Sequence, residues 1–458
     1  MVFSSLIFLF RFLPLSFIIY FFTPKKFKNL ALFLISITFY FLGEPNYFFI
    51  IIFSVFIDYF LSLGIEKYRD RRYLPKIFLS FSMLFNLGML FFFKYMNFFI
   101  ENIRLLIGIN FKVLELTLPL GISFYTFQTM SYTIDVFKGK IKPEKNIIDF
   151  ALYVSMFPQL IAGPIVKYSD IKDNLKERKT SLNNLEDGIR LFIIGLFYKV
   201  FIANNIGCLY EDALSIGFLN ISMIFAWLGV LAFSLQIYFD FLGYSLMARG
   251  LGKIFGFSFP KNFNYPYVSR SIREFWRRWH ITLGGFFKEY IYIPLGGNRV
   301  NKYKVYRNLF IVWTLTDLWH GAGFNFILWG LYFFIIILLE KLFLNEFLKK
   351  YRVFSHIYTI LLLLIGWSIF ASENLNMLKE VLSSLFSFKF SFDFVYYLLN
   401  YRFILILSIV LSTPLLNKFY KKLKRFNYVH SLALITCFLI SITYLVDETY
   451  NPFLYFRF

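Results

Sequence analysis

The stretch Leu309-Phe310-Ile311-Val312-Trp313-Thr314-Leu315-Thr316-Asp317-Leu318-Trp319-His320 is an apolar run whose two ionisable residues are Asp317 and His320, and Gly321-Ala322-Gly323 follows it. A run of this kind is typical of a helix inside a lipid bilayer. An ionisable side chain is costly there, and it is a functional candidate by default. The alternative for His320 is a structural histidine whose ring is satisfied by a backbone carbonyl at a helix end.

The rest of the chain is similarly apolar. Hydrophobic residues make up 58% and aromatic residues 23% of the 458 residues, and the mean hydropathy is +0.62. This composition indicates an all-α polytopic membrane protein. We expect about 11 or 12 crossings, because each crossing takes about 20 helical residues. The apolar stretches are residues 6–22, 30–42, 48–65, 77–93, 118–137, 189–206, 221–247, 309–320, 324–339, 357–370, 403–416 and 431–446.

The basic residues predict the orientation of the chain. A net charge of +21 is compatible with nucleic-acid binding, but the lysines and arginines cluster in short loops between apolar stretches, as the positive-inside rule requires. We therefore expect no nucleic-acid partner, a cytoplasmic position for the basic loops, and an N-terminus outside. These loops are residues 25–28, 67–76, 138–145, 341–352 and 418–425.

The remaining features favour one membrane unit. Residues 1–22 carry no basic segment before their apolar run, so we expect a retained helix rather than a cleaved signal. Cys208 and Cys437 are the two cysteines, which predicts neither a disulfide framework nor a cysteine metal site. We expect a single domain over residues 1–458, with N-terminal helices to residue 116, a catalytic core over 117–345 and C-terminal helices over 346–458.

Two basic segments, residues 138–145 and 167–179, lie unusually close together. The stretch between them contains Pro158 and the pair Gly163-Pro164. If both basic segments are cytoplasmic, this stretch does not cross the membrane once. We predict a re-entrant hairpin, because broken backbone is tolerated at membrane depth where it is buried in protein or lines a cavity. The alternative is one ordinary crossing with a basic outer loop.

Residues 269–280 read Ser-Arg-Ser-Ile-Arg-Glu-Phe-Trp-Arg-Arg-Trp-His. On a helix, Arg270, Arg273 and Arg277 share one face, Trp276 and His280 share another, and Glu274 pairs with Arg278. Ser269 or Ser271 is the expected cap. The pattern is typical of an interfacial helix at the cytoplasmic leaflet, anchored to anionic headgroups. That interpretation accounts for the arginines but not for His280.

At these residues the sequence resembles the membrane-bound O-acyltransferase (MBOAT) superfamily, of the bacterial alginate O-acetyltransferase type. The resemblance covers the whole chain. The matching strings are residues 1–5, Pro119 to Gln128, Phe157 to Pro164, Glu274 to Ile281, Tyr290 to Arg299, Leu318 to Ala322 and Pro452 to Phe458. The resemblance implies helices around a central funnel, with His320 as the catalytic histidine and His280 as a second conserved polar position. It also implies a cytoplasmic acyl donor, an acceptor on the outer face and an exported partner of the SGNH type.

Chemistry gives an independent reason for a histidine. Attack of a hydroxyl on a thioester needs a base that works near neutral pH, and imidazole has the matching pKa. His320 is our candidate base and His280 supports it. Asp317, where relatives usually carry a small residue, is either an orienting partner of His320 or a polar residue facing the cavity. Asn298 is a candidate oxyanion donor.

No ligand spacing in the sequence predicts a metal, and we expect no bound cofactor. Acetyl-CoA is the expected donor substrate. Its phosphates would be met by the cytoplasmic arginines Arg270, Arg273, Arg277 and Arg299.

The predicted function is an inner-membrane O-acetyltransferase acting on an exported or cell-wall polysaccharide. A D-alanyl transfer protein of teichoic acid modification is the nearest alternative. Acylation of a lipid or protein differs only in the acceptor. A transporter or flippase without acyl transfer is the alternative of another class, because its polar cavity and broken helices give a similar composition.

Overall fold

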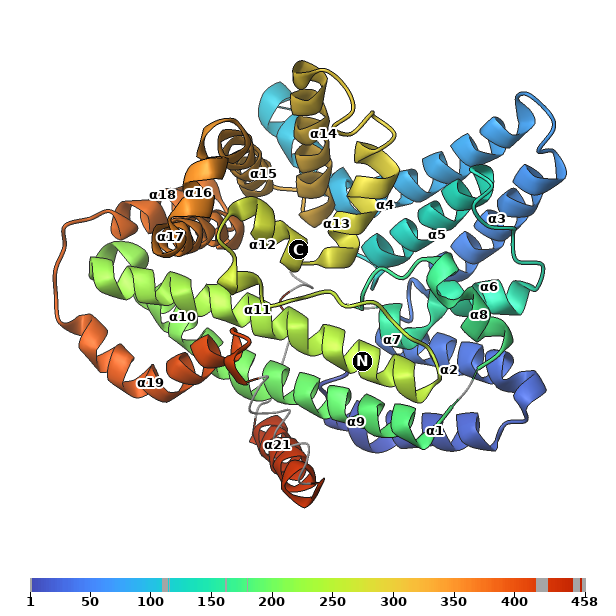
Figure 1. Cartoon of the computed structure of the whole chain (residues 1–458), viewed down its shortest axis with the longest axis horizontal. Coiled ribbons are helices and arrows are strands. Elements are labelled where there is room, and N and C mark those ends of the chain that lie inside the picture. The colour runs from blue at the N-terminus through green and yellow to red at the C-terminus, as the bar shows by residue number, and fades with distance from the viewer. Residues whose placement is uncertain are drawn as a thin grey trace. The chain divides into compact units, whose positions relative to one another are not determined.

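The computed structural model describes residues 2–108, 114, 116–160, 163–178, 180–416, 427–447 and 454. Every regular element in these residues is a helix or helical turn, in agreement with the predicted all-α class (Figure 1). Two sequence predictions lie outside the described residues: the basic loop 418–425 and, apart from Leu454, the string from Pro452 to Phe458.

The described helices form two compact units. The first unit comprises residues 1–192 and 247–260, and the second comprises residues 193–246 and 261–458. Two long helices belong to both units: α9 (Leu182–Phe197) and α11 (Met223–Ile254). The expected division at residues 117 and 346 stays a prediction.

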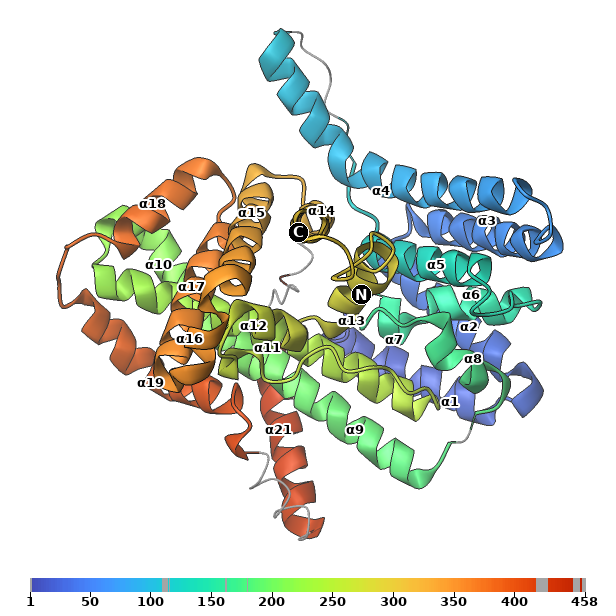
Figure 2. The same ribbon diagram turned by 45° about the horizontal axis from the view of Figure 1, so that its top comes forward.

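The first unit contains the N-terminal helices. They are α1 (Leu13–Phe22), α2 (Lys28–Gly43), α3 (Phe48–Lys67), α4 (Leu74–Ile107), α5 (Ile122–Phe137), α6 (Ile147–Ser155), α7 (Phe157–Leu160) and α8 (Tyr168–Lys176). Within this unit α3 and α4 pack side by side (Figure 2).

The second unit contains the shorter helices of the predicted catalytic region and the C-terminal helices. They are α10 (Asn204–Ile216), α12 (Ile272–Arg278), α13 (Ile281–Phe287), α14 (Lys302–His320), α15 (Phe324–Leu339), α16 (Asn345–Lys350), α17 (Arg352–Ala371), α18 (Leu375–Leu385), α19 (Asp393–Leu411) and α21 (Asn427–Asp447). Here α15 packs against both α14 and α17 (Figure 2).

Among the described residues, nine helical segments are long and apolar enough to cross a membrane. They begin at Lys25, Phe48, Leu74, Leu182, Met223, Phe324, Arg352, Asp393 and Tyr428. This number is below the expected 11 or 12, because three predicted stretches form shorter or more polar helices. The first is the short apolar helix Phe8–Phe22. The second, α5, starts late, at Ile122, and the third, α14, extends back into the polar residues near Lys302.

Close packing of α9 against α11 depends on glycine. In the second unit a Cβ on Gly243 would lie 2.7 Å from the carbonyl oxygen of Gly195, and in the first unit a Cβ on Gly250 would lie 2.5 Å from that of Gly188. Small residues at such contacts let the backbones of membrane helices approach closely (Figure 1). A larger residue at Gly243 or Gly250 would force the two helices apart.

The predicted re-entrant segment consists of short, buried helices. After Asn146 caps α6, the chain breaks at Met156, forms the single turn α7 and passes Gly163 before α8 begins. In the described part of this segment, no helix is long enough to cross a membrane. These short helices are compatible with the hairpin, which stays a prediction.

The two flanks of this segment are joined by an ion pair. Lys176 Nζ lies 2.8 Å from Glu144 Oε1, and the Tyr168 hydroxyl donates to Glu144 at 2.5 Å. Burial raises the pKa of Glu144, but hydrogen bonds from Lys176, Tyr168 and the Asn146 amide outweigh it and hold that pKa below its ordinary value. These contacts bring the two flanks of the segment together.

Candidate active site

His320 is the last residue of α14, and the backbone turns away directly after it. Gly321 is extended, with φ −172° and ψ 165°. A Cβ on Gly321 would lie 2.0 Å from the Phe326 ring, so only glycine fits there. The turn leaves the His320 ring buried at the end of the helix, with 4% of the residue exposed.

The His320 ring is held by its own helix. Nδ1 lies 2.8 Å from the carbonyl oxygen of Thr316, one turn earlier. A carbonyl oxygen only accepts, so Nδ1 carries the proton and the lone pair of the neutral ring is on Nε2. The backbone carbonyl that a purely structural role of His320 would require is thus present. It occupies one ring nitrogen and fixes the tautomer that a general base needs at the other.

His280 lies at the break between α12 and α13. Its backbone is left-handed, with φ 42° and ψ 55°, which is uncommon for a residue with a side chain. The Asn262 side-chain oxygen accepts from the Thr282 amide at 3.2 Å and from the Thr282 hydroxyl at 2.8 Å. The same oxygen lies 3.2 Å from His280 Nδ1, so Nδ1 is the donor. Burial, and then the neighbouring His320, hold the pKa of His280 well below its ordinary value.

Trp319 connects the two histidines. Its ring centroid lies 5.8 Å from that of His280 and 4.9 Å from that of His320. Phe241 on α11 packs edge-on against His280 at 4.7 Å. The structure therefore brings both predicted histidines into one buried aromatic cluster of the second unit.

Two further rings complete the surroundings of His320. Trp329 on α15 lies 4.9 Å from it and Phe370 on α17 lies 5.8 Å from it, centroid to centroid. Trp329 in turn contacts Trp276 on α12 at 5.4 Å and Phe333 on α15 at 5.3 Å. Helices distant in sequence thus build a rigid apolar wall around the imidazole.

Asp317 points to a neighbouring helix. A Cβ on Gly330 of α15 would lie 1.5 Å from Asp317 Oδ2, so the carboxyl group fills the space that this glycine leaves. Among the described residues, Asp317 Oδ1 has no hydrogen-bond partner. The contact that holds His320 Nδ1 comes from Thr316, not from Asp317.

Asn298 lies on an exposed turn. Its side-chain oxygen accepts from the Tyr292 hydroxyl at 2.8 Å and from Lys341 Nζ at 3.2 Å. In the part of the chain that the structure describes, no hydrogen bond joins Asn298 to His280 or His320. The structure thus does not bring this candidate oxyanion donor to the buried histidines.

The arginine helix is shorter than predicted. The expected Ser271 cap and the Glu274–Arg278 pair are both confirmed, at 3.0 Å and 2.8 Å. The prediction that Trp276 and His280 share a helix face is wrong, because α12 ends at Arg278 and His280 follows in the left-handed conformation.

The predicted helix face shared by Arg270, Arg273 and Arg277 is also wrong, because not all three lie on α12. Arg270 precedes α12, which begins at Ile272. Arg270, Arg277 and Arg299 are exposed, whereas Arg273 is half-buried and donates to Asn345 at 2.7 Å.

Glu340 is a structural residue that the sequence analysis missed. Its buried carboxylate accepts from the Ile272 amide at 2.6 Å and from the Arg273 amide at 3.1 Å. It thereby satisfies two amides that the first turn of α12 leaves without helical partners. Its position after a long apolar run gave no signal of this contact, which joins segments 68 residues apart.

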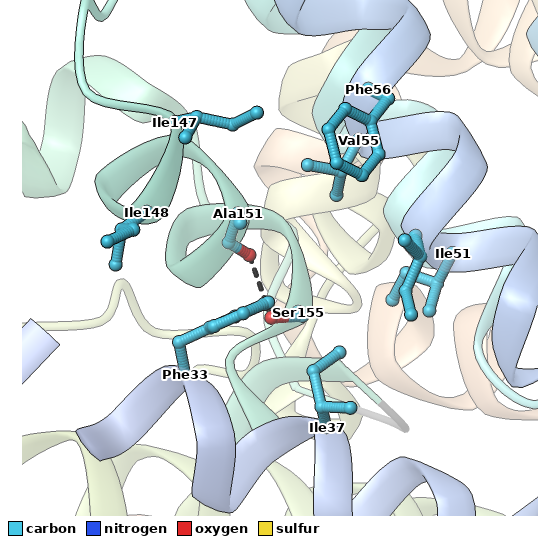
Figure 3. Close-up of a pocket in the computed structure, with 10 residues that line it drawn as sticks. Phe33, Ile37, Ile51, Val55, Phe56, Ile147, Ile148, Ala151 and Ser155 are labelled. Carbon is cyan, nitrogen blue, oxygen red and sulfur yellow. Dashed lines mark hydrogen bonds between the residues drawn. The ribbon is translucent and has the colours of Figure 1, made fainter. Parts of the chain in front are cut away.

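One cavity of about 130 Å³ lies in the first unit, whereas His280 and His320 belong to the second unit. It is lined by apolar side chains of α2, α3 and α6, and the Ser155 hydroxyl is turned to the Ala151 carbonyl at 2.7 Å (Figure 3). This lining offers no group for acyl transfer. Among the described residues, no cluster of three or more His, Cys, Asp or Glu is placed to bind a metal.

The chain is similar to known proteins over most of its length. The sequence model of the membrane-bound O-acyltransferase family, MBOAT, matches residues 138–378, which include both histidines. The chain is 38% identical over 393 residues to the probable alginate O-acetylase AlgI of Azotobacter vinelandii, covering 85% of this chain and 78% of that protein. It is 36% identical over 425 residues to the peptidoglycan O-acetyltransferase of Helicobacter pylori, covering 84% and 80%.

A more distant relative is the teichoic acid D-alanyltransferase of Bacillus subtilis, which is 28% identical over 243 residues, or 51% of this chain and 61% of that protein. The match and the helical architecture define the class: the chain is a multi-pass membrane protein. It belongs to the membrane-bound O-acyltransferase family, as the resemblance of its motifs predicted.

Proposed function

We propose that this protein transfers an acetyl group from a cytoplasmic thioester, acetyl-CoA, to sugar hydroxyls of an exported or cell-wall polysaccharide. The observation that carries the proposal is the Thr316 carbonyl bonded to His320 Nδ1, which puts the basic lone pair on Nε2. Alignment over 85% of the chain with a probable alginate O-acetylase supports acetyl as the group transferred.

In the proposed reaction His320 Nε2 removes the proton of the acceptor hydroxyl as its oxygen attacks the thioester carbon. The collapse of the tetrahedral intermediate breaks the carbon–sulfur bond, and the thiol leaves with that proton. His280, with its Nδ1 held by Asn262, supports the site through its ring contact with Trp319.

The donor is proposed from the chemistry of its phosphates. The phosphates of acetyl-CoA need cationic groups that face water. Exposed arginines near α12 and before α14 meet this need: Arg270, Arg277 and Arg299. We propose these three for phosphate contacts. Arg273 is the remaining candidate, although its side chain is engaged by Asn345.

The relatives support a polysaccharide acceptor. Their names specify alginate in one case and peptidoglycan in the other. We propose the cytoplasmic (inner) membrane as the location, and an SGNH-type partner on the outer face that receives or directs the acetyl group.

The test is ester-linked acetate released by mild base from surface polysaccharide and from peptidoglycan. The strains are wild type, a deletion, and the deletion carrying His320→Ala or His356→Ala at matched membrane abundance. His356 on α17 is half-buried and belongs to no motif, so it is the matched control. We expect acetate to disappear in the deletion, to return with His356→Ala, and to stay absent with His320→Ala.

Other outcomes distinguish the alternatives. Base-released D-alanine in place of acetate would favour the teichoic acid reaction, which the shorter match with the D-alanyltransferase disfavours. Full restoration by His320→Ala would contradict the proposed mechanism. Ester levels that never change would favour a transporter without acyl transfer.

A further inference from the structure

Three tryptophans of the second unit have an indole N–H without a hydrogen-bond partner among the described residues: Trp276, Trp329 and Trp367. Of these three, Trp329 is in ring contact with His320. The residue is 0% exposed, and among the described residues its indole Nε1 has no hydrogen-bond acceptor. A buried donor left without a partner costs free energy and requires an explanation. Its ring lies 4.9 Å from His320, centroid to centroid, with an interplanar angle of 65°.

The surrounding rings hold Trp329 in place. Trp276 and Phe333 pack edge-on against it, with interplanar angles of 87° and 83°, and Phe370 packs against it at 5.3 Å. Side chains from α12, α15 and α17 thus fix the indole. A donor that cannot turn away is preorganised, because it needs no reorganisation when charge develops nearby.

We propose that the indole N–H of Trp329 is the oxyanion donor of the acyl-transfer site, binding the carbonyl oxygen of the acyl donor while His320 acts as base. The inference rests on the proposed function. It extends that function by naming the group that stabilises the developing negative charge.

The step balances without any further reactant. The acceptor oxygen forms a bond to the carbonyl carbon, its proton passes to His320 Nε2, and the carbonyl oxygen becomes an oxyanion that accepts from Trp329 Nε1–H. The oxyanion then re-forms the carbonyl as the carbon–sulfur bond breaks. The thiolate takes the proton from His320 and leaves as the thiol.

Other candidate donors fit less well. Asn298 is exposed and bonded to Tyr292 and Lys341. Asn325 donates to the Phe370 carbonyl at 3.4 Å. Ala322 and Gly323, two and three residues after His320, have no side-chain hydrogen-bond donor.

The experiment compares Trp329→Phe with Trp227→Phe. Trp227 on α11 is outside the aromatic cluster, and its Nε1 donates to the Leu385 carbonyl at 2.9 Å. Both changes remove one indole N–H and keep an aromatic ring. Membranes carrying each variant are given radiolabelled acetyl-CoA. Thiol release, base-labile acetyl ester, the pH profile, membrane abundance and the melting temperature in detergent are measured.

We expect Trp329→Phe to lower kcat about 10²-fold or more, as loss of one oxyanion donor does, with an unchanged KM for acetyl-CoA and an unchanged pH profile. Trp227→Phe should stay close to wild type. The inference is overturned if Trp329→Phe keeps its kcat, if both variants lose activity equally, or if the loss comes with a shifted pH profile or a lower melting temperature. If wild-type membranes transfer no acetyl group, the proposed function fails first, and the inference fails with it.

Discussion

At the residue scale, the imidazole of His320 has one defined proton and one defined lone pair. Thr316 contributes only a backbone carbonyl at 2.8 Å, so no other side chain is needed to set the tautomer. In hydrolases that use a triad, a carboxylate does this work, and its loss costs about 10⁴-fold in rate. The helix end replaces that carboxylate here.

We predict that Asp317→Asn retains acetyl transfer within about an order of magnitude, because an orienting carboxylate would cost far more. The amide keeps the size of the group that fills the space at Gly330. The pH profile should also stay that of wild type, since Thr316 holds the His320 ring. Rates at several pH values in membranes of equal enzyme content test this. A loss of several orders of magnitude at normal abundance would make Asp317 an orienting partner.

The sequence was sufficient to single out both histidines, because each lies in a dense motif of Trp, Gly and Arg. It was not sufficient to find Asn262, Glu340 or Trp329. Their contacts join residues 18, 68 and 9 positions apart, and only the packed structure places them together. The left-handed backbone conformation of His280 could not be predicted either, because the residue spacing around it is that of a continuous helix.

At the element scale, the re-entrant hairpin between α5 and α8 stays a prediction. Two closely spaced basic segments, Pro158 and the pair Gly163-Pro164 suggested it, and the Glu144–Lys176 ion pair brings its two flanks together. The length of α12 was not predictable, because helical spacing continues through His280 although the backbone does not.

We predict that single cysteines at Lys140→Cys and Lys172→Cys react with a membrane-impermeant thiol reagent from the same side, the cytoplasmic one. Both positions are exposed and flank the hairpin. The background is a variant without Cys208 and Cys437, and intact cells are compared with inverted vesicles. Labelling of the two positions from opposite sides would show a single crossing and contradict the hairpin.

At the scale of the whole molecule, the class follows from composition, whereas the number of crossings does not. Nine described helical segments satisfy both length and hydropathy. The helix ending at His320 is too polar over its first turns to count as a membrane-spanning helix, because residues 302–307 include Lys302, Lys304 and Arg307. A short apolar run in sequence does not show where its helix begins.

The orientation of the whole chain is testable at two exposed turns. We predict that Asn46→Cys, between α2 and α3, is labelled from outside, and that Arg71→Cys, between α3 and α4, is labelled from the cytoplasm, because basic loops stay inside. The same cysteine-free background and impermeant reagent apply. The reverse pattern would invert the topology and move the basic loops to the outer face.

The contact between Asp317 and Gly330 also limits how the sequence can evolve. With a carboxyl oxygen 1.5 Å from where a Cβ would lie, Gly330→Ala requires the Asp317 side chain to move. A larger residue at position 330 therefore costs less after position 317 has lost its side chain. Across an alignment, we expect larger residues at position 330 to occur together with small residues at position 317.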